Sequence, residues 1–170
     1  MEVVKMKKLS VLMLVCVMAV AAQAVLIDDF EDGNLDEYTS TVILDANGGS
    51  SNTAAWQIAG GALQLNTTVY DGIEQYAMIY DGLSLGVGEE LRVDIAHNGA
   101  SQDIGLYVGG TTPVTGTRQD YVAMYGRGDQ LFSRGFDGTS EYPLAGNWGP
   151  VSYDTLFIAR TAANTYETGW

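Results

Sequence analysis

Residues 104–110 read IGLYVGG, in which apolar residues stand at every second position and a glycine pair follows. Successive side chains of a β-strand point to opposite faces, so Ile104, Leu106 and Val108 can all be buried on one face. Glycine accepts positive φ at little cost, so the glycine pair permits a tight reversal. This stretch therefore predicts a half-buried strand that ends in a turn.

The same two-residue period recurs along most of the remaining sequence. We predict further strands at residues 25–30, 54–59, 61–66, 75–80, 91–95, 121–125, 129–134, 153–159 and 164–170. Residues 38–53 predict a long loop with at most a short strand at 41–44, and residues 127–129 (RGD) predict a hairpin turn. No stretch keeps the spacing of an amphipathic helix, so the sequence predicts an all-β, antiparallel sandwich or barrel.

The first 24 residues have the order of a removable export signal. Lys5, Lys7 and Lys8 precede an apolar run, which ends in a small-x-small site formed by Ala22 and Ala24. This order predicts cleavage after Ala24. The apolar run is shorter than the about 18 residues of a membrane span, so we expect no membrane insertion after cleavage. The mature chain is therefore predicted to be secreted or displayed at the cell surface.

Residues 25–170 have a length suited to one domain. The single cysteine, Cys16, lies in the predicted signal, so we expect no disulfide in the mature chain. The lysines lie there too, so the formal net charge of −13 becomes more negative after cleavage. This charge disfavours nucleic acids and anionic membrane surfaces as partners, whereas neutral ligands and divalent cations are compatible with it.

Two stretches near the start of the predicted domain resemble a known superfamily. Residues 28–36 read DDFEDGNLD and residues 56–65 read WQIAGGALQL. They resemble the opening strands of concanavalin A-like (laminin-G-like) domains, where an F-x-D-G-x-L start precedes W-x-V-x-x-G-x-L. The resemblance implies a jelly-roll β-sandwich. Such domains have further strands after the segment that residues 156–160 resemble, so we expect a domain that is incomplete at its C-terminus.

The same opening implies a structural Ca²⁺ site. In calcium-bearing jelly-roll binding modules, a Phe-Glu-x-Gly start contributes its Glu and a nearby carbonyl, and residues 30–33 (FEDG) match it. The candidate ligands that the resemblance implies are Asp29, Glu31, Asp32 and Gly33. Asp154 is a candidate for the late carboxylate that completes such a site. A solvated acidic turn explains the same acids without a metal and stays open as an alternative.

Aromatic and polar residues in the second half indicate a sugar-binding surface. The candidate ligand contacts are Tyr107, Arg118, Asp120, Tyr121, Tyr125 and Trp148. Tyr121 and Tyr125 lie four residues apart in one predicted strand, so they share a face, with Ala123 between them. Aromatic planes stack on sugar rings, and Arg118 and Asp120 are suited to bind hydroxyls. Tyrosines also pack across strands without a ligand, so a structural role stays open.

The sequence lacks the patterns of the main catalytic classes. Laminarinase-like enzymes of this fold carry Glu-x-Asp-x-x-Glu, whereas residues 89–94 (EELRVD) hold acids in another register. His97 is the single histidine, which disfavours triads and histidine-rich metal sites. We therefore expect a secreted, non-catalytic, lectin-like module that binds an extracellular glycan or cell-surface polysaccharide. A structural or adhesive β-sandwich is the alternative, and a polysaccharide hydrolase or lyase is a third option.

Overall fold

The computed structural model describes residues 25–45, 56–65, 74–80, 82–96, 103–109, 120–137 and 139–170. These ranges are all-β, as predicted, and contain no helix that is long and apolar enough to cross a membrane. The strands are β1 (Tyr38–Asp45), β2 (Trp56–Ile58), β3 (Leu63–Leu65), β4 (Glu74–Tyr80), β5 (Glu90–Asp94), β6 (Ile104–Gly109), β7 (Tyr121–Arg127), β8 (Gln130–Phe136), β9 (Glu141–Trp148), β10 (Thr155–Ala162) and β11 (Thr165–Gly169). The predicted signal peptide, Arg118 and His97 lie outside the described residues.

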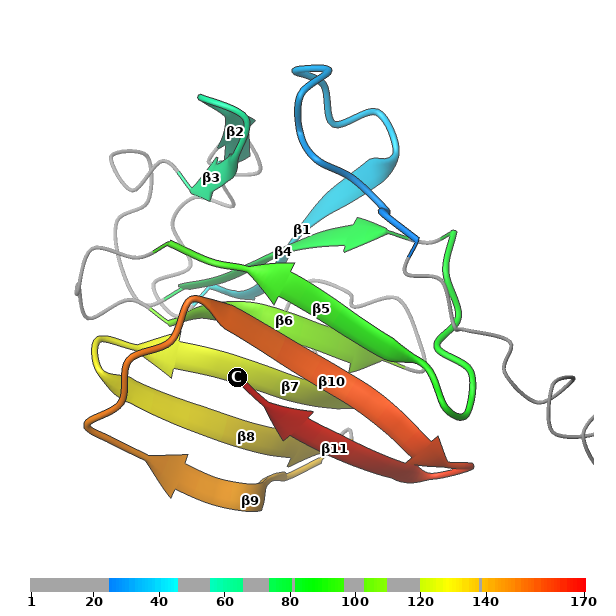
Figure 1. The fold of residues 1–170 in the computed structure, drawn as a ribbon, viewed down its shortest axis with the longest axis vertical. Coiled ribbons are helices and arrows are strands. Elements are labelled where there is room, and N and C mark those ends of the chain that lie inside the picture. The colour runs from blue at the N-terminus through cyan, green and yellow to red at the C-terminus, as the bar shows by residue number, and fades with distance from the viewer. Residues whose placement is uncertain are drawn as a thin grey trace, which may run out of the picture.

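The strands form several antiparallel sheets. One sheet has four strands in the order β6-β7-β8-β9, and another has three in the order β11-β10-β5. Two-stranded ribbons are formed by β1 with β4 and by β2 with β3. In Figure 1, β10 and β11 lie in front of β7 and β8, and β10 packs on β6 and β7. The two larger sheets therefore stack face to face in a sandwich-like arrangement.

The main core lies between these two sheets. Met124 of β7, Leu131 of β8, and Leu156 and Ile158 of β10 are fully buried and form one cluster. Val93 of β5 pairs with Leu156 and packs against the same cluster. Burying each such side chain stabilises the fold by about 1.5–3 kcal/mol. Apolar contact between the sheets can therefore hold the sandwich together without a disulfide.

One buried polar residue, Ser133 of β8, interrupts this apolar interior. Its exposed fraction is 0%, and Thr168 of β11 donates a hydrogen bond of 2.6 Å to its Oγ. A buried hydroxyl costs free energy unless it is hydrogen-bonded. In addition, the ring of Trp148 of β9 packs against that of Trp170, which follows β11, with centroids 5.0 Å apart. These contacts join the β11 edge of one sheet to β8 and β9 of the other.

Two predictions for the first part of the domain are wrong. Residues 25–30 form no strand, because Asp28 Oδ1 accepts the N–H of Phe30 at 2.7 Å and Phe30 adopts a φ of 57°. Residues 38–53 do not begin as a loop, because β1 (YTSTVILD) is an eight-residue strand paired with β4. Its β-branched residues favour strands, and its pairing partners lie 29 to 42 positions away, where a local pattern does not show them.

The local sequence pattern also predicts no strand over Glu141–Trp148, where the structure has β9. Pro143 and Gly146 are typical of turns, but β9 is an edge strand, where a missing N–H donor is tolerated. Ser133 pairs with Gly146 and Arg134 with Pro143, so two residues of β9 stand outside the ladder. Gly146 has a φ of 109°, which glycine adopts more readily than other residues.

Candidate functional site

The four-stranded sheet has a second face, which points away from the core. In β7, Val122 and Met124 face the core, and Tyr121, Ala123 and Tyr125 point to the opposite side. We call this side the outer face. By the strand register it consists of Gly105, Tyr107 and Gly109 of β6, Tyr121, Ala123, Tyr125 and Arg127 of β7, Gln130, Phe132, Arg134 and Phe136 of β8, and Glu141, Pro143 and Asn147 of β9.

Two stacked aromatic pairs cross from β7 to β8 on the outer face. The rings of Tyr121 and Phe136 are 5.4 Å apart and inclined by 16°, and those of Tyr125 and Phe132 are 5.1 Å apart and inclined by 15°. Tyr107 of β6 meets Tyr121 edge-on at 6.1 Å. Four residues of strand separate the two pairs, which is about 13 Å. The structure therefore brings three predicted tyrosines together on a surface longer than one sugar ring.

Two small residues, Gly105 and Ala123, lie between the aromatic rings of the outer face. Gly105 pairs with Tyr125, and a Cβ at residue 105 would overlap the backbone of Met124 and Tyr125. Glycine therefore allows β6 to approach β7 closely at this point. Ala123 pairs with Tyr107 on one side and with Arg134 on the other. Its small side chain is buried between the two aromatic pairs, with an exposed fraction of 8%.

Two arginines border the ring of Phe132. The Cζ atoms of Arg127 and Arg134 lie 5.4 Å and 5.1 Å from its centroid, and such cation–π contacts contribute about 0.5–2 kcal/mol. Arg127 also forms a bidentate ion pair with Asp103, which raises the pKa of the guanidinium. Its side chain is thus held on the outer face. As predicted, residues 127–129 form a hairpin turn, with Gly128 at a φ of 59°.

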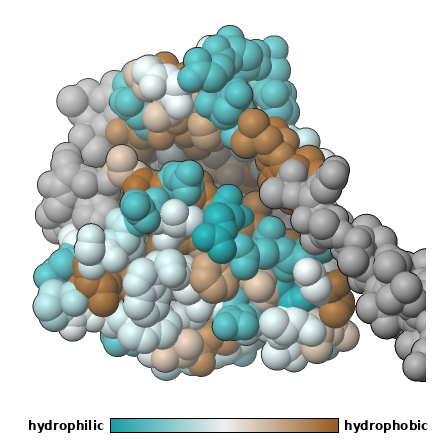
Figure 2. Space-filling model, viewed as in Figure 1, coloured by the Kyte–Doolittle hydropathy of each residue, from teal (hydrophilic) through white to brown (hydrophobic). Residues whose placement is uncertain are grey.

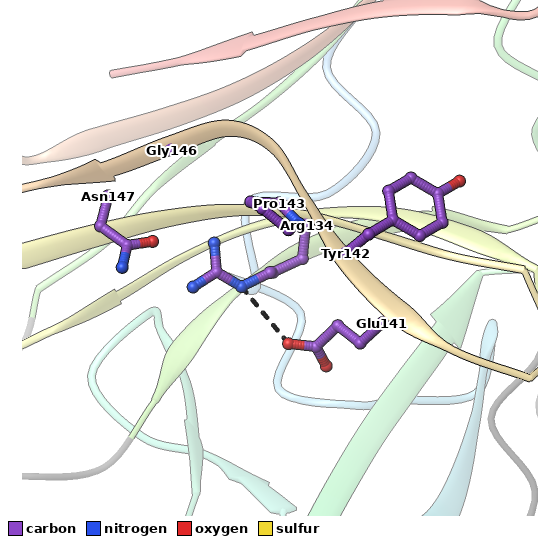
Figure 3. A pocket seen from close by; sticks show the side chains of 6 residues that line it. All are labelled: Arg134, Glu141, Tyr142, Pro143, Gly146 and Asn147. Atoms are coloured by element: carbon purple, nitrogen blue, oxygen red, sulfur yellow. Dashed lines mark ion pairs between the residues drawn. The ribbon is translucent and has the colours of Figure 1, made fainter.

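A cavity of about 300 Å³ opens on the outer face between β8 and β9. Its lining residues are Arg134, Glu141, Tyr142, Pro143, Gly146 and Asn147. Arg134 Nε lies 3.3 Å from Glu141 Oε1, and Arg134 Nη1 donates to the carbonyl of Ser133 at 3.0 Å. In Figure 3 the polar groups of Arg134, Glu141 and Asn147 border the same space, while Tyr142 points away.

The two β9 residues that stand outside the ladder, Leu144 and Ala145, open this cavity. They lie between Pro143, which pairs with Arg134, and Gly146, which pairs with Ser133. A bulge of this kind bends a strand away from its partner and redirects the side chains beside it. The guanidinium of Arg134 consequently reaches a recess rather than a regular sheet surface. We call this recess, with Arg134, Glu141 and Asn147, the β9 pocket.

The charges on the outer face are balanced locally. Arg127 is paired with Asp103, and Arg134 is paired with Glu141. Burial raises the pKa of the Tyr125 hydroxyl, and Glu141 and Asp103 add to this effect while both arginines oppose it. Tyr125 therefore stays neutral at physiological pH and keeps its proton for hydrogen bonding. The surface suits a neutral, hydroxyl-rich ligand better than an ion.

Of the remaining predicted ligand contacts, Trp148 does not join this surface. Trp148 lies on the opposite face of the sheet, because it pairs with the buried Leu131 and packs beside the core. Asp120 is exposed just before β7, and Arg118 lies outside the described residues. A role for these three in ligand binding stays a prediction.

Five residues of the site were not predicted from the sequence. They are Phe132, Arg134 and Phe136 of β8, and Glu141 and Asn147 of β9. The β8 residues alternate in the run QLFSRGF, so a local signal for a shared face was present. Their position opposite Tyr125, Ala123 and Tyr121 depends on the register of β7 with β8. Glu141 and Asn147 lie on β9, which the local sequence pattern does not predict.

The acidic segment at residues 28–36 forms Asx turns, in which backbone N–H groups donate hydrogen bonds to the side-chain carboxylates. Asp29 Oδ1 accepts the N–H of Glu31 at 3.1 Å, and Asp32 Oδ1 accepts the N–H of Asn34 at 3.1 Å. Gly33 has a φ of 74°, and the Glu31 carboxylate lies over Gly61. In the part of the chain that the structure describes, no three Asp, Glu, His or Cys side chains are grouped to hold a metal ion. Calcium binding stays a prediction that rests on the resemblance.

Two other surfaces offer fewer converging groups. Figure 2 shows the side of the molecule where β10 and β11 lie in front, and hydrophilic and hydrophobic residues are mixed there around a hollow. On this side Arg92 covers the Phe157 ring at 5.4 Å and pairs with Glu90. A second cavity, of about 620 Å³, lies beside the β7–β8 turn, where the Tyr153 hydroxyl already donates to the Gly128 carbonyl at 2.9 Å.

Aromatic and polar groups converge on the outer face, and this combination is characteristic of ligand sites. The outer face, with the β9 pocket at its edge, is therefore the candidate functional site. No family model, no curated protein and no solved structure matches the chain.

Proposed function

We propose that the protein is a secreted, non-catalytic carbohydrate-binding module with a concanavalin A-like jelly-roll fold, and that the outer face binds its ligand. The ligand is an extracellular glycan or cell-surface polysaccharide. One observation carries the proposal: two stacked aromatic pairs and the β9 pocket lie together on the sheet face opposite the main core cluster. The predicted signal over residues 1–24 supports the extracellular setting.

The path of the chain supports the jelly-roll part of the proposal. β5 and β10 are neighbours in the three-stranded sheet, although the whole four-stranded sheet lies between them in sequence. The chain thus leaves one sheet after β5, builds β6 to β9 in the facing sheet, and returns beside β5 as β10. Long returns of this kind between two antiparallel sheets are characteristic of Greek-key and jelly-roll sandwiches.

The chemistry of the outer face matches that of a sugar. Sugar rings present C–H groups on their faces and hydroxyls on their edges, so they require both apolar planes and hydrogen-bonding groups. Tyr121, Tyr125 and Phe132 supply half-buried aromatic surface. Arg134 supplies N–H donors and Glu141 supplies acceptors at the adjoining pocket. Both requirements are met within one continuous region of the sheet.

A glycan array, followed by pull-down with insoluble polysaccharides, tests the proposal. We expect the protein to bind and each of Tyr121→Ala and Tyr125→Ala to weaken binding about tenfold, because each variant loses about 1–1.5 kcal/mol of ring contact. Phe157→Ala is the matched control, since this half-buried ring lies on the other sheet, and its binding should be unchanged. Far-ultraviolet circular dichroism must show that all variants keep their strand signal.

Two results would count against a carbohydrate-binding module. The first is an array on which the wild-type protein binds nothing, which would favour a structural or adhesive sandwich. The second is binding that both tyrosine variants retain in full, which would place the ligand elsewhere on the molecule.

A further inference from the structure

The β9 pocket differs in chemistry from the aromatic surface beside it. Arg134 has an exposed fraction of 14% and is held in place by Phe132, by Glu141 and by the Ser133 carbonyl. Glu141, with an exposed fraction of 32%, presents its carboxylate to the same space, and Asn147 borders it from the far end of β9. The pocket therefore places a fixed guanidinium, a carboxylate and an amide within a lining whose exposed area is largely apolar.

These three side chains offer a complementary set of hydrogen-bonding groups. A guanidinium is a donor without acceptor capacity, an ionised carboxylate is an acceptor, and the amide of Asn147 is both. A sugar hydroxyl also donates one hydrogen bond and accepts others. Two hydroxyls on adjacent carbons can therefore donate to Glu141 and Asn147 while they accept from Arg134 and Asn147. A single ring with a neighbouring hydroxyl pair can satisfy the whole set.

An anionic sugar fits the same pocket poorly. Glu141 already neutralises Arg134 through the ion pair at 3.3 Å, so no uncompensated positive charge faces the ligand there. A carboxylate or sulfate group has no proton to donate to Glu141 and is repelled by it. Arg127, the other arginine of the outer face, is neutralised by Asp103. The net charge of −13 adds repulsion at longer range.

We infer that the β9 pocket recognises a pair of adjacent hydroxyl groups on a neutral sugar, and that the aromatic pairs hold neighbouring rings of the same glycan. This inference rests on the proposed function and adds the class of ligand: a neutral polysaccharide rather than a uronic-acid or sulfated one. The Leu144–Ala145 bulge gives a ligand access to these groups, because it opens the recess beside Arg134 (Figure 3).

Affinity electrophoresis of the whole protein tests the class of ligand. The neutral probes are β-glucan, mannan and galactan, and the acidic probes are polygalacturonate, alginate and a sulfated galactan, each at low and high NaCl. We expect binding to a neutral probe, with an affinity that salt changes less than about twofold, because no counterions are released. Binding to an acidic probe that high salt abolishes would overturn the inference and leave the carbohydrate-binding proposal standing. If the protein binds none of the probes, the carbohydrate-binding proposal itself is refuted.

Variants of the pocket test the assigned groups. Glu141→Gln and Asn147→Ala should each weaken binding to the neutral probe about tenfold or more, as expected for lost hydrogen bonds in a charged pocket. Glu90→Gln is the matched control, because Glu90 forms the exposed ion pair with Arg92 on the other sheet. Its affinity should equal that of the wild type.

Full affinity in both pocket variants would overturn the inference, whatever the tyrosine variants do. Asn147 is exposed on an edge strand, so Asn147→Ala decides the question if Glu141→Gln does not fold. Deleting Leu144 and Ala145 restores a continuous ladder and should abolish binding in a protein that still unfolds cooperatively. Retained neutral-glycan binding in that deletion variant would count against the pocket.

Discussion

The hydrogen bond between Ser133 and Thr168 gives a direct test of the face-to-face packing of the two larger sheets. It joins β8 to β11 across the core at 2.6 Å, and its two partners differ in burial. Ser133 is fully buried, whereas Thr168 is only partly buried. This difference allows the effects of the two single substitutions to be ranked.

Thr168→Val should cost more stability than Ser133→Ala. Valine keeps the shape of threonine but leaves the Ser133 hydroxyl buried without its partner, which costs about 1–3 kcal/mol. After Ser133→Ala, the Thr168 hydroxyl can still bind water, so the loss is about 0.5–1.5 kcal/mol. In the double variant neither hydroxyl is stranded. We therefore expect its loss to be smaller than the sum of the single losses by about 1 kcal/mol.

Urea unfolding of the four proteins, followed by tryptophan fluorescence and circular dichroism, measures this coupling. Thr161→Val is the control, because the Thr161 hydroxyl donates to the Thr165 carbonyl at an exposed site and its replacement should cost less than about 0.5 kcal/mol. Losses that add within about 0.3 kcal/mol would refute the contact. A larger loss for Ser133→Ala than for Thr168→Val would contradict the difference in burial.

Three further predictions concern the core, alkaline stability and calcium. A methyl group at Gly126 would overlap the ring of Tyr153, so Gly126→Ala should lower the free energy of unfolding by about 1–3 kcal/mol in urea. Burial raises the pKa of Tyr38 and Tyr125, so these hydroxyls lose their protons at a higher pH in the folded state than in the unfolded state. Their contribution to the free energy of unfolding should be fully present below about pH 10 and should be lost as the pH rises above it. In a Tyr38→Phe, Tyr125→Phe double variant, the free energy of unfolding should fall less steeply with pH. An unchanged slope would show that other groups cause the loss. The resemblance predicts that CaCl₂ raises the melting temperature and that Glu31→Gln removes the effect; a midpoint that neither CaCl₂ nor a chelator moves would eliminate the site.

Much of the strand content could be predicted from local patterns. β6 and β7 were predicted within two residues at each end, because a strand with one buried face must repeat its apolar residues every second position. The two strands that were not predicted in full, β1 and β9, do not show this alternation clearly. β9 contains Pro143 and Gly146 and is stable because it pairs along the edge of β8. β1 is a strand because a distant segment, β4, pairs with it.

The candidate site shows the same division between local and distant information. The sequence by itself determined that Tyr121 and Tyr125 share one face of a strand, because side chains alternate along any extended chain. Only the tertiary structure decided that Phe136 and Phe132 stand opposite them and that Trp148 points to the other side. The physical reason is that register sets cross-strand neighbours, and a shift of one residue in pairing exchanges every side chain between the two faces of a sheet.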